Sequence, residues 1–260
     1  MLPLKNPFLT YDRRGAGFCA FVTLLVTSLL LVSCGNLTAP IPAVNLPAAT
    51  QAALPRTAVM AEVQGQVVTQ APGAQTWSPA VVGALLRAGD QVKTLSDGRA
   101  RIEFSEGSTL RIAPDTVFTL TELNEDAANP VTRLSLAAGR VFVRLGNLLG
   151  ENGAMEVITP VGLAAVRGSL ISVAFDAATG QMAAACFVGN CEVATTAGRV
   201  SFTDRQQVVI QSPDLPPQPP QPFAPEQEQI FQQNVPDLQQ VLAGEELLHS
   251  LQASATARAE

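Results

Sequence analysis

Apolar and polar residues alternate along most of the middle of the chain. In residues 99–104, Ala100, Ile102 and Phe104 alternate with charged residues, and the same period of two returns in 109–112. Successive side chains of a strand point to opposite faces, so this period predicts strands with one buried face and one wet face.

Segments of this character recur at the short spacing of an all-β protein. Extended segments are expected at 59–63, 66–69, 91–94, 99–104, 109–112, 116–121, 132–136, 140–145, 155–159, 169–175, 181–188, 191–195, 199–203 and 207–211. Residues 81–86 could form a short helical turn or an irregular strand, and Gly98 is expected to supply a positive φ in the turn before 99–104. Because no helical period is visible between 89 and 211, we predict an all-β fold, either a two-layer β-sandwich or a short β-roll.

Residues 1–34 are predicted to be a signal peptide. Basic residues precede an apolar run, 17–32, which has the length of a signal-peptide core and is short for a membrane span. The run ends in Leu31-Val32-Ser33-Cys34, which resembles the bacterial lipobox. The resemblance implies that Cys34 carries acyl chains such as palmitate and anchors an extracytoplasmic lipoprotein in the bacterial cell envelope. The alternative is an uncleaved anchor helix with a chance cysteine at its end, and both interpretations export the rest of the chain.

Appendages of distinct composition flank the β-region. Residues 35–57 are rich in Pro, Ala, Thr and Asn, which predicts a flexible linker. Residues 212–225 are predicted to be a Pro-rich polyproline spacer, and 226–260 a helical tail interrupted at Pro236. The second tail helix, 237–255, has an apolar stripe that needs a partner. The stripe could fold back on the β-domain, pair with a second copy or bind another envelope protein.

Several short motifs occur in the order of a known family. They are Gly89-Asp90 with Thr94, Asp97-Gly98, Gly107-Ser108, Gly139-Arg140-Val141, Thr159-Pro160 and Arg167-Gly168-Ser169. Together they resemble the FecR domain over about 59–211, and the domain is delimited here as 58–211. Ser169 stands where the family usually has threonine, and it keeps the hydroxyl group.

The resemblance implies the β-fold of the family and a location outside the cytoplasm. Members of the founding type resemble sigma-factor regulators, with a cytoplasmic domain, a membrane span and this module outside. Here we expect only a signal peptide before the module, so the sigma-binding activity is not carried over.

Cys186 and Cys191 are expected to form a disulfide. Between them, Gly189-Asn190 can supply a tight turn that would place the two cysteines on facing strands of a hairpin. Such a pair oxidises outside the cytoplasm. The alternative is a redox or metal site, but the spacing is not the two-residue spacing of redox motifs and the β-region has no histidine.

Charge and histidine content limit the function. The formal net charge is −6, and residues 212–260 hold seven acidic residues against Arg258. No segment has the basic excess that nucleic-acid binding requires. The only histidine, His249, lies in the tail, which removes His-dependent catalysis and His-based metal sites from the β-region. We therefore expect no enzyme, no cofactor and no metal.

Some single residues could have a chemical or a structural role. Trp77, the only tryptophan, is expected to plug the core rather than to stack on a ligand. Arg167 is expected to be partly buried and to bind loop carbonyls or a carboxylate such as that of Asp90, with anion binding as the alternative. Asp90, Asp97 and Asp115 adjoin turns and are expected to cap them.

The sequence as a whole predicts a lipid-anchored binding or sensing module that is not catalytic. It would present a β surface to an envelope protein or glycan. A polyanionic glycan would favour an exposed arginine cluster, for which the candidates are Arg99, Arg101, Arg111, Arg140 and Arg144. The alternative is a structural envelope protein that assembles through its C-terminal helix, with self-association through 237–255.

Overall fold

The structure, a computed structural model of the chain, describes residues 56–124, 130–146, 153–240 and 243. The predicted signal peptide with Cys34, most of the predicted linker and His249 lie outside these residues. All of the described residues belong to one compact unit, Ala52–Glu260.

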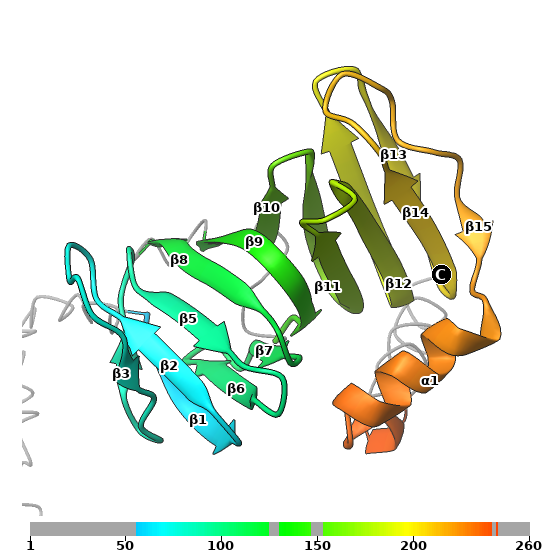
Figure 1. Cartoon of the computed structure of the whole chain (residues 1–260). Helices are drawn as coiled ribbons and strands as arrows, with labels where there is room; N and C mark the ends of the chain where they lie inside the picture. Colours follow the sequence, from blue (N-terminus) through cyan, green and yellow to red (C-terminus); the bar gives the residue numbers. More distant parts are fainter. Residues whose placement is uncertain (1–55, 125–129, 147–152, 241–242, 244–260) are drawn as a thin grey trace, which may run out of the picture. The chain divides into compact units, whose positions relative to one another are not determined.

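Strands dominate the described part of this unit, and they are followed by a helix of ten residues and by helical residues at 238–240 (Figure 1). In chain order the elements are β1 (Ala58–Gln64), β2 (Val67–Gln70), β3 (Ser78–Pro79), β4 (Leu85–Leu86), β5 (Gln91–Thr94), β6 (Arg99–Phe104), β7 (Thr109–Ile112), β8 (Val117–Leu123), β9 (Val131–Arg144), β10 (Ala154–Thr159), β11 (Gly162–Asp176), β12 (Gln181–Thr195), β13 (Gly198–Phe202), β14 (Gln206–Ile210), β15 (Gln221–Pro222) and α1 (Pro225–Asn234). Strands take up 55% of the described residues and helix 8%, which confirms the all-β class.

Three long strands join two layers. The first half of β9 pairs with β8 and β10, whereas its second half pairs with β7 and β11. β11 and β12 divide in the same way, because β10 and β13 pair only with their parts near Val166 and Cys191, and β14 pairs only with the part of β12 near Ala184. The first layer runs β3-β2-β5-β8-β9-β10-β11-β12-β13, and the second runs β4-β1-β6-β7-β9-β11-β12-β14-β15.

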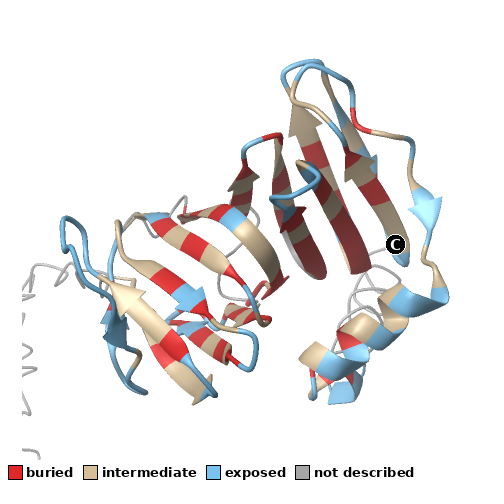
Figure 2. Ribbon diagram, in the orientation of Figure 1, coloured by how far each residue is buried: buried red, intermediate tan, exposed pale blue. Residues whose placement is uncertain are grey.

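One hydrophobic core lies between the layers. Leu134 and Val157 of the first layer and Ile102, Val143 and Val173 of the second belong to the same buried cluster. Figure 2 shows the alternation as buried bands along the strands. Each such side chain contributes about 1.5–3 kcal/mol on burial, so this core is the main force that holds the layers together. The prediction of two packed β layers is confirmed.

The long strands bend at glycines instead of ending there. Gly139 in β9 has a φ of +90°, and Gly189 in β12 has a φ of +96°. Glycine takes such values without steric strain, so the chain changes direction while the ladder continues. The predicted break between 132–136 and 140–145 and the predicted hairpin at 189–190 are therefore wrong, since β9 and β12 are each a single strand.

The disulfide between Cys186 and Cys191 is present and spans the bend of β12. Its Cα atoms are 6.0 Å apart, whereas five residues of straight strand would separate them by about 16 Å. Cys186 belongs to the part of β12 in the second layer and Cys191 to the part in the first. The bond fixes the corner of one strand and does not join two strands of a hairpin.

Three smaller predictions are settled by the structure. Gly98 does not take a positive φ; a Cβ there would lie 2.2 Å from the Gln66 carbonyl oxygen, so close approach requires the glycine. Trp77 is 38% exposed and is not a core plug. Within 81–86, the strand is formed, because β4 pairs with the start of β1.

α1 covers part of the outer face of the second layer. Phe142 of β9 and Phe187 of β12 point away from the core, and their ring centroids lie 5.4 and 4.8 Å from that of Phe231 in α1. Phe231 is fully buried, and Leu238 joins the same cluster. The tail therefore folds back on the β-domain over 225–240. The rest of the predicted stripe, apart from residue 243, lies outside the described residues.

The ends of α1 follow from its sequence. Pro225 lies in the first turn, where its fixed φ suits a helix start. Glu226 and Glu228 are also in the first turn, at the positive end of the helix dipole. Pro236 follows the C-cap residue Val235 and prevents the helix from continuing in register.

The Pro-rich segment lies along the sheet and is not a free spacer. The Thr196 N–H donates to the Pro213 carbonyl at 3.2 Å, and the Gln218 N–H donates to the Val209 carbonyl at 3.0 Å. Pro217 is buried, and β15 at the end of the segment pairs with β14. The segment therefore leads the chain along a fixed path to α1.

Candidate functional site

The family motif at Gly89-Asp90 forms the turn before β5. Gly89 has a φ of +95°, and its N–H donates to the Leu120 carbonyl of β8 at 2.7 Å. The Asp90 carboxylate accepts a hydrogen bond from the Arg87 N–H at 2.7 Å, which is the capping role predicted for it. These residues close a turn and leave no group directed at a ligand.

The other two turn aspartates differ from the prediction. Asp97 accepts a hydrogen bond from the Gln66 N–H at 3.3 Å, so it connects two neighbouring turns and does not cap its own. Asp115 has a φ of +54°, and within the described residues its side chain has no hydrogen-bond partner.

Thr94 lies at the centre of a buried polar junction. Its hydroxyl donates to the Ala113 carbonyl at 2.7 Å and accepts from the Thr116 N–H at 3.0 Å. The Thr116 hydroxyl accepts in turn from the Arg140 N–H at 3.0 Å. A Cβ on Gly139 would lie 2.3 Å from that hydroxyl oxygen, which explains the glycine. The junction ties β5 and the turn before β8 to the bend of β9.

Gly107-Ser108 closes the turn between β6 and β7. Gly107 has a φ of +86°, and its N–H donates to the Phe104 carbonyl at 2.8 Å. Ser108 is fully buried, and its hydroxyl accepts from the Gly146 N–H at 2.9 Å.

Thr159-Pro160 closes the turn between β10 and β11. The Thr159 hydroxyl accepts from the Gly162 N–H at 3.2 Å and donates to the Gly162 carbonyl at 2.9 Å. The remaining motif, 167–169, lies at the bend of β11, where Arg167 is opposite Asn190 in the register with β12. The side chains of 167–169 are outside what the structure describes, so the contacts expected of Arg167 stay a prediction. The motif residues that are described build the scaffold and do not converge on one site.

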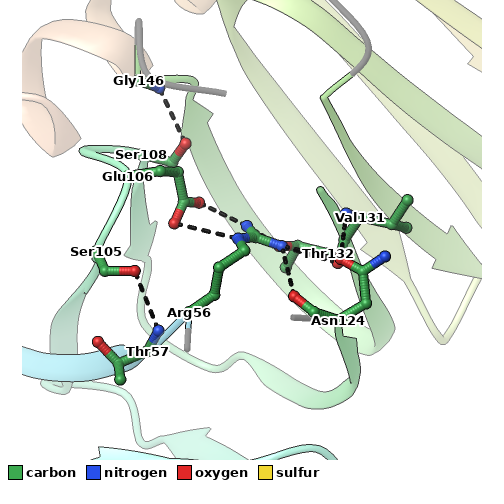
Figure 3. A network of polar contacts seen from close by, with 9 residues as sticks. All are labelled: Arg56, Thr57, Ser105, Glu106, Ser108, Asn124, Val131, Thr132 and Gly146. Atoms are coloured by element: carbon green, nitrogen blue, oxygen red, sulfur yellow. Dashed lines mark hydrogen bonds and ion pairs between the residues drawn. The ribbon is translucent and has the colours of Figure 1, made fainter. Parts of the chain in front are cut away.

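A buried ion pair fixes the start of the β-domain (Figure 3). The Arg56 guanidinium donates to both carboxylate oxygens of Glu106, at 2.7 and 3.4 Å, and the two side chains are 7% and 8% exposed. It also donates to the Thr132 hydroxyl at 2.9 Å and to the Val131 carbonyl at 3.0 Å. Such a fork of donors suits bidentate binding of a carboxylate.

The next residue is held as well, because the Thr57 N–H donates to the Ser105 hydroxyl at 3.1 Å. The last two residues of the predicted linker are therefore part of the folded domain. No local pattern predicted this, since one arginine in a Pro- and Thr-rich stretch has no periodic neighbours.

The five candidate arginines share the outer face of the second layer. They alternate with core residues on β6, β7 and β9, and Arg101 lies directly opposite Arg111. Arg101 forms ion pairs with Glu62 and Glu103, and Arg111 forms them with Glu62 and Asp237, the latter at 2.7 Å. Acids of the same chain thus neutralise the centre of the cluster, which argues against a polyanionic glycan.

Two of these arginines line an open pocket of about 540 Å³ beside α1. Within the described residues, neither Arg99 nor Arg140 forms an ion pair. Arg99 donates to the Asn234 side-chain oxygen, and Arg140 donates to the Ser172 hydroxyl at 3.0 Å. The pocket is also lined by the turns at 113–115 and 176–178 and by Ile230 and Asn234 of α1.

The charged groups of this pocket are of both signs. Burial lowers the pKa of Arg140, because desolvation disfavours its cation, but a guanidinium is still charged at neutral pH. Hydrogen bonds from the Ala178 N–H, and then from Thr179, hold the pKa of Asp176 below its usual value. Asp115 lines the pocket as well. A ligand here would meet cations, carboxylates and apolar surface together.

The described residues hold neither a metal-binding cluster nor a membrane-spanning helix. In this part of the chain, no group of three or more His, Cys, Asp or Glu residues could hold a metal ion. No helix among the described residues has the length and hydropathy to cross a membrane.

The aromatic cluster under α1 was not anticipated from the sequence. Phe223 and Phe231 stack with ring centroids 5.8 Å apart. The ring of Phe187 lies 6.1 Å from Phe223 and 4.8 Å from Phe231, and the guanidinium of Arg205 is 5.0 Å from its centre. The available signal was the pair Ile230-Phe231 in an otherwise polar helix, which marked the side that packs.

Comparison with known proteins bears on the β-domain. The sequence model of the family described as FecR protein matches residues 90–206, which confirms the resemblance of the motifs. No curated protein matches the chain. Two crystal structures of a candidate anti-sigma factor from Parabacteroides distasonis ATCC 8503 are similar, each with 14% identity, a TM-score of 0.46 and coverage of 55% of this chain and 64% of that chain. The chain thus spans less than two thirds of the length of that protein.

Proposed function

We propose that this chain, whose residues 90–206 are a FecR domain, is a lipid-anchored binding and sensing module of the bacterial cell envelope. It presents the outer face of its second β layer to a protein partner and catalyses no reaction. The acylated Cys34 holds it at the membrane outside the cytoplasm. What supports a binding role is the family match together with the open pocket beside α1.

The pocket is the single observation that carries the proposal. Arg99 and Arg140 line it without carboxylate partners in the described part of the chain, while Asp115 and Asp176 line it too. A polyanionic glycan would be attracted by the first pair and repelled by the second. A protein segment with both polar and apolar groups satisfies all of them, so a protein is the favoured partner.

Assembly through the C-terminal helix has less support. Phe231, Val235 and Leu238 of the tail are buried against the chain's own sheet. They are therefore not available to a second copy unless the tail detaches.

The test is site-specific photo-crosslinking in living cells. A photoreactive residue replaces Ala177, which is exposed and lines the pocket, or Ser201, which is exposed on β13 in the other layer. Each is compared in the wild-type chain and in Cys34→Ala. We expect one envelope protein to be captured from position 177, not from 201, and only when Cys34 is present. Capture of the chain by itself, or of wall polymer alone, would refute the sensing role.

A further inference from the structure

The exposed large apolar side chains of the described residues gather in one short segment. Trp77, Val81, Val82 and Leu85 lie within nine residues, and Leu215 is the only other such residue in the described part. We call residues 77–85 the apolar edge. Val81 is 65% exposed at the start of a turn that the Ala84 N–H closes onto its carbonyl. Turns are ordinarily polar, and clustered exposed apolar side chains mark a contact surface.

The backbone of the apolar edge is fixed. It crosses between the layers, because β3 pairs with β2 of the first layer and β4 pairs with β1 of the second. The Ala80 N–H donates to the Val67 carbonyl at 2.9 Å, and the Gly83 N–H donates to the Met60 carbonyl at 2.8 Å. β3 is exposed throughout (Figure 2). The side chains are therefore displayed on a rigid frame and need no rearrangement to make a contact.

The apolar edge lies next to the point where the linker joins the domain. Ala58, two residues after Arg56, pairs with Leu86, and Val59 pairs with Leu85. The buried pair of Arg56 and Glu106 fixes this point. A flexible linker of the predicted length has a root-mean-square reach of about 25 Å. An anchored Cys34 would therefore hold the apolar edge, on average, within about that distance of the membrane.

Charge in this region suits a membrane surface. Between residues 63 and 89 the only charged residue is Arg87, so the segment itself carries no carboxylate. Tryptophan favours the boundary between headgroups and acyl chains, where its ring is apolar and its N–H stays wet.

We propose that the apolar edge is a second membrane contact, which inserts Trp77, Val81, Val82 and Leu85 into the interfacial region of an anionic bilayer. This inference rests on the proposed lipid anchor, which supplies the high local concentration of membrane. The contact orients the domain, so that the edge formed by β3 and β4 faces the bilayer.

The test uses the only tryptophan of the chain as its probe. The mature, acylated protein is isolated from membranes and reconstituted in vesicles of phosphatidylglycerol and phosphatidylcholine with brominated acyl chains. Bromine quenches a tryptophan only at short range, so loss of emission reports insertion of Trp77. The variant is Leu85→Asp, and the matched control is Leu215→Asp, because these leucines are 58% and 53% exposed at different places.

We expect blue-shifted, strongly quenched emission in the wild type and in Leu215→Asp. Leu85→Asp should lower the inserted-to-free ratio by roughly tenfold to a hundredfold, the amount expected for one leucine side chain. Protein that floats with the vesicles but is not quenched would overturn the contact and leave the anchor intact. Protein that does not float would overturn both. Equal quenching in all three proteins would also overturn the membrane contact. So would a blue shift that appears without lipid when the protein self-associates.

Discussion

Glu106→Gln tests whether the folded domain depends on the Glu106 carboxylate to balance the buried charge of Arg56. The substitution keeps the size of the side chain and removes its charge. The Arg56 guanidinium would then be left 7% exposed with only hydroxyl and carbonyl acceptors, chiefly of Thr132 and Val131. Breaking a buried ion pair by removing one partner costs about 3–5 kcal/mol, which is a third or more of the stability of many domains.

The measurement is urea denaturation followed by far-UV circular dichroism and by the fluorescence of Trp77. The matched control is Glu103→Gln, since Glu103 pairs with Arg101 at the surface and is about half exposed. A surface pair contributes about 0–1 kcal/mol, so this control should unfold almost as the wild type does. The double variant Arg56→Met, Glu106→Leu should recover most of the loss, because it leaves no unpaired charge.

The result that would refute the reasoning is a small effect. Glu106→Gln could lower the free energy of unfolding by less than about 1 kcal/mol, or by no more than Glu103→Gln does. Water would then be solvating the Arg56 guanidinium, and its burial would not make the loss of the carboxylate costly. A double variant as unstable as Glu106→Gln would show that the hydrogen bonds of the Arg56 guanidinium stabilise this part of the domain, and that the neutralisation of its charge does not.

Three further predictions concern the corners and turns of the sheet. Gly139→Ala should cost about 1–3 kcal/mol more than Gly73→Ala in the same denaturation assay, because both glycines have a positive φ but only a Cβ at 139 meets backbone and Thr116 within 3 Å. Replacing both Cys186 and Cys191 by alanine should lower stability by about 2 kcal/mol, the value for so short a loop, and should abolish the response of the unfolding midpoint to reductant. Asp176→Ala should destabilise the domain at neutral pH, and the difference should shrink as acid protonates the wild-type carboxylate, because a depressed pKa contributes stability only above it; a difference that is constant with pH would contradict this.

The strands could be predicted because one face of each layer is wet. Alternation in β6 and β7 separates Ala100 and Ile102 from the arginines, and the period of two is visible without knowledge of the partner strands. The bends of β9 and β12 could not be predicted in the same way. Glycine with positive φ serves a tight turn and a bent strand equally well, and only pairing with distant strands decides between them.

The site residues were harder to predict because they depend on long-range packing. Trp77 is apolar, but its residue type does not decide whether the side chain faces the core or solvent. In the structure it is exposed to solvent. The tail pattern shows a stripe, but not that Phe231 meets Phe142 and Phe187 on the chain's own sheet. Arg56 has no local pattern at all, since its acidic partner lies 50 residues away.

The continuity of β9, β11 and β12 through both layers limits the conformational changes by which this domain could transmit a binding event. The layers cannot slide or separate unless all three strands lose their structure at the bends. The bend of β12 is also closed by a disulfide. The two layers should exchange their amide hydrogens as a single cooperative unit. Binding at the outer face can then be transmitted by moving the β-domain as a rigid body. It can also be transmitted by releasing the tail, which is held to the β-domain by side-chain contacts. A hinge inside the sandwich is not available.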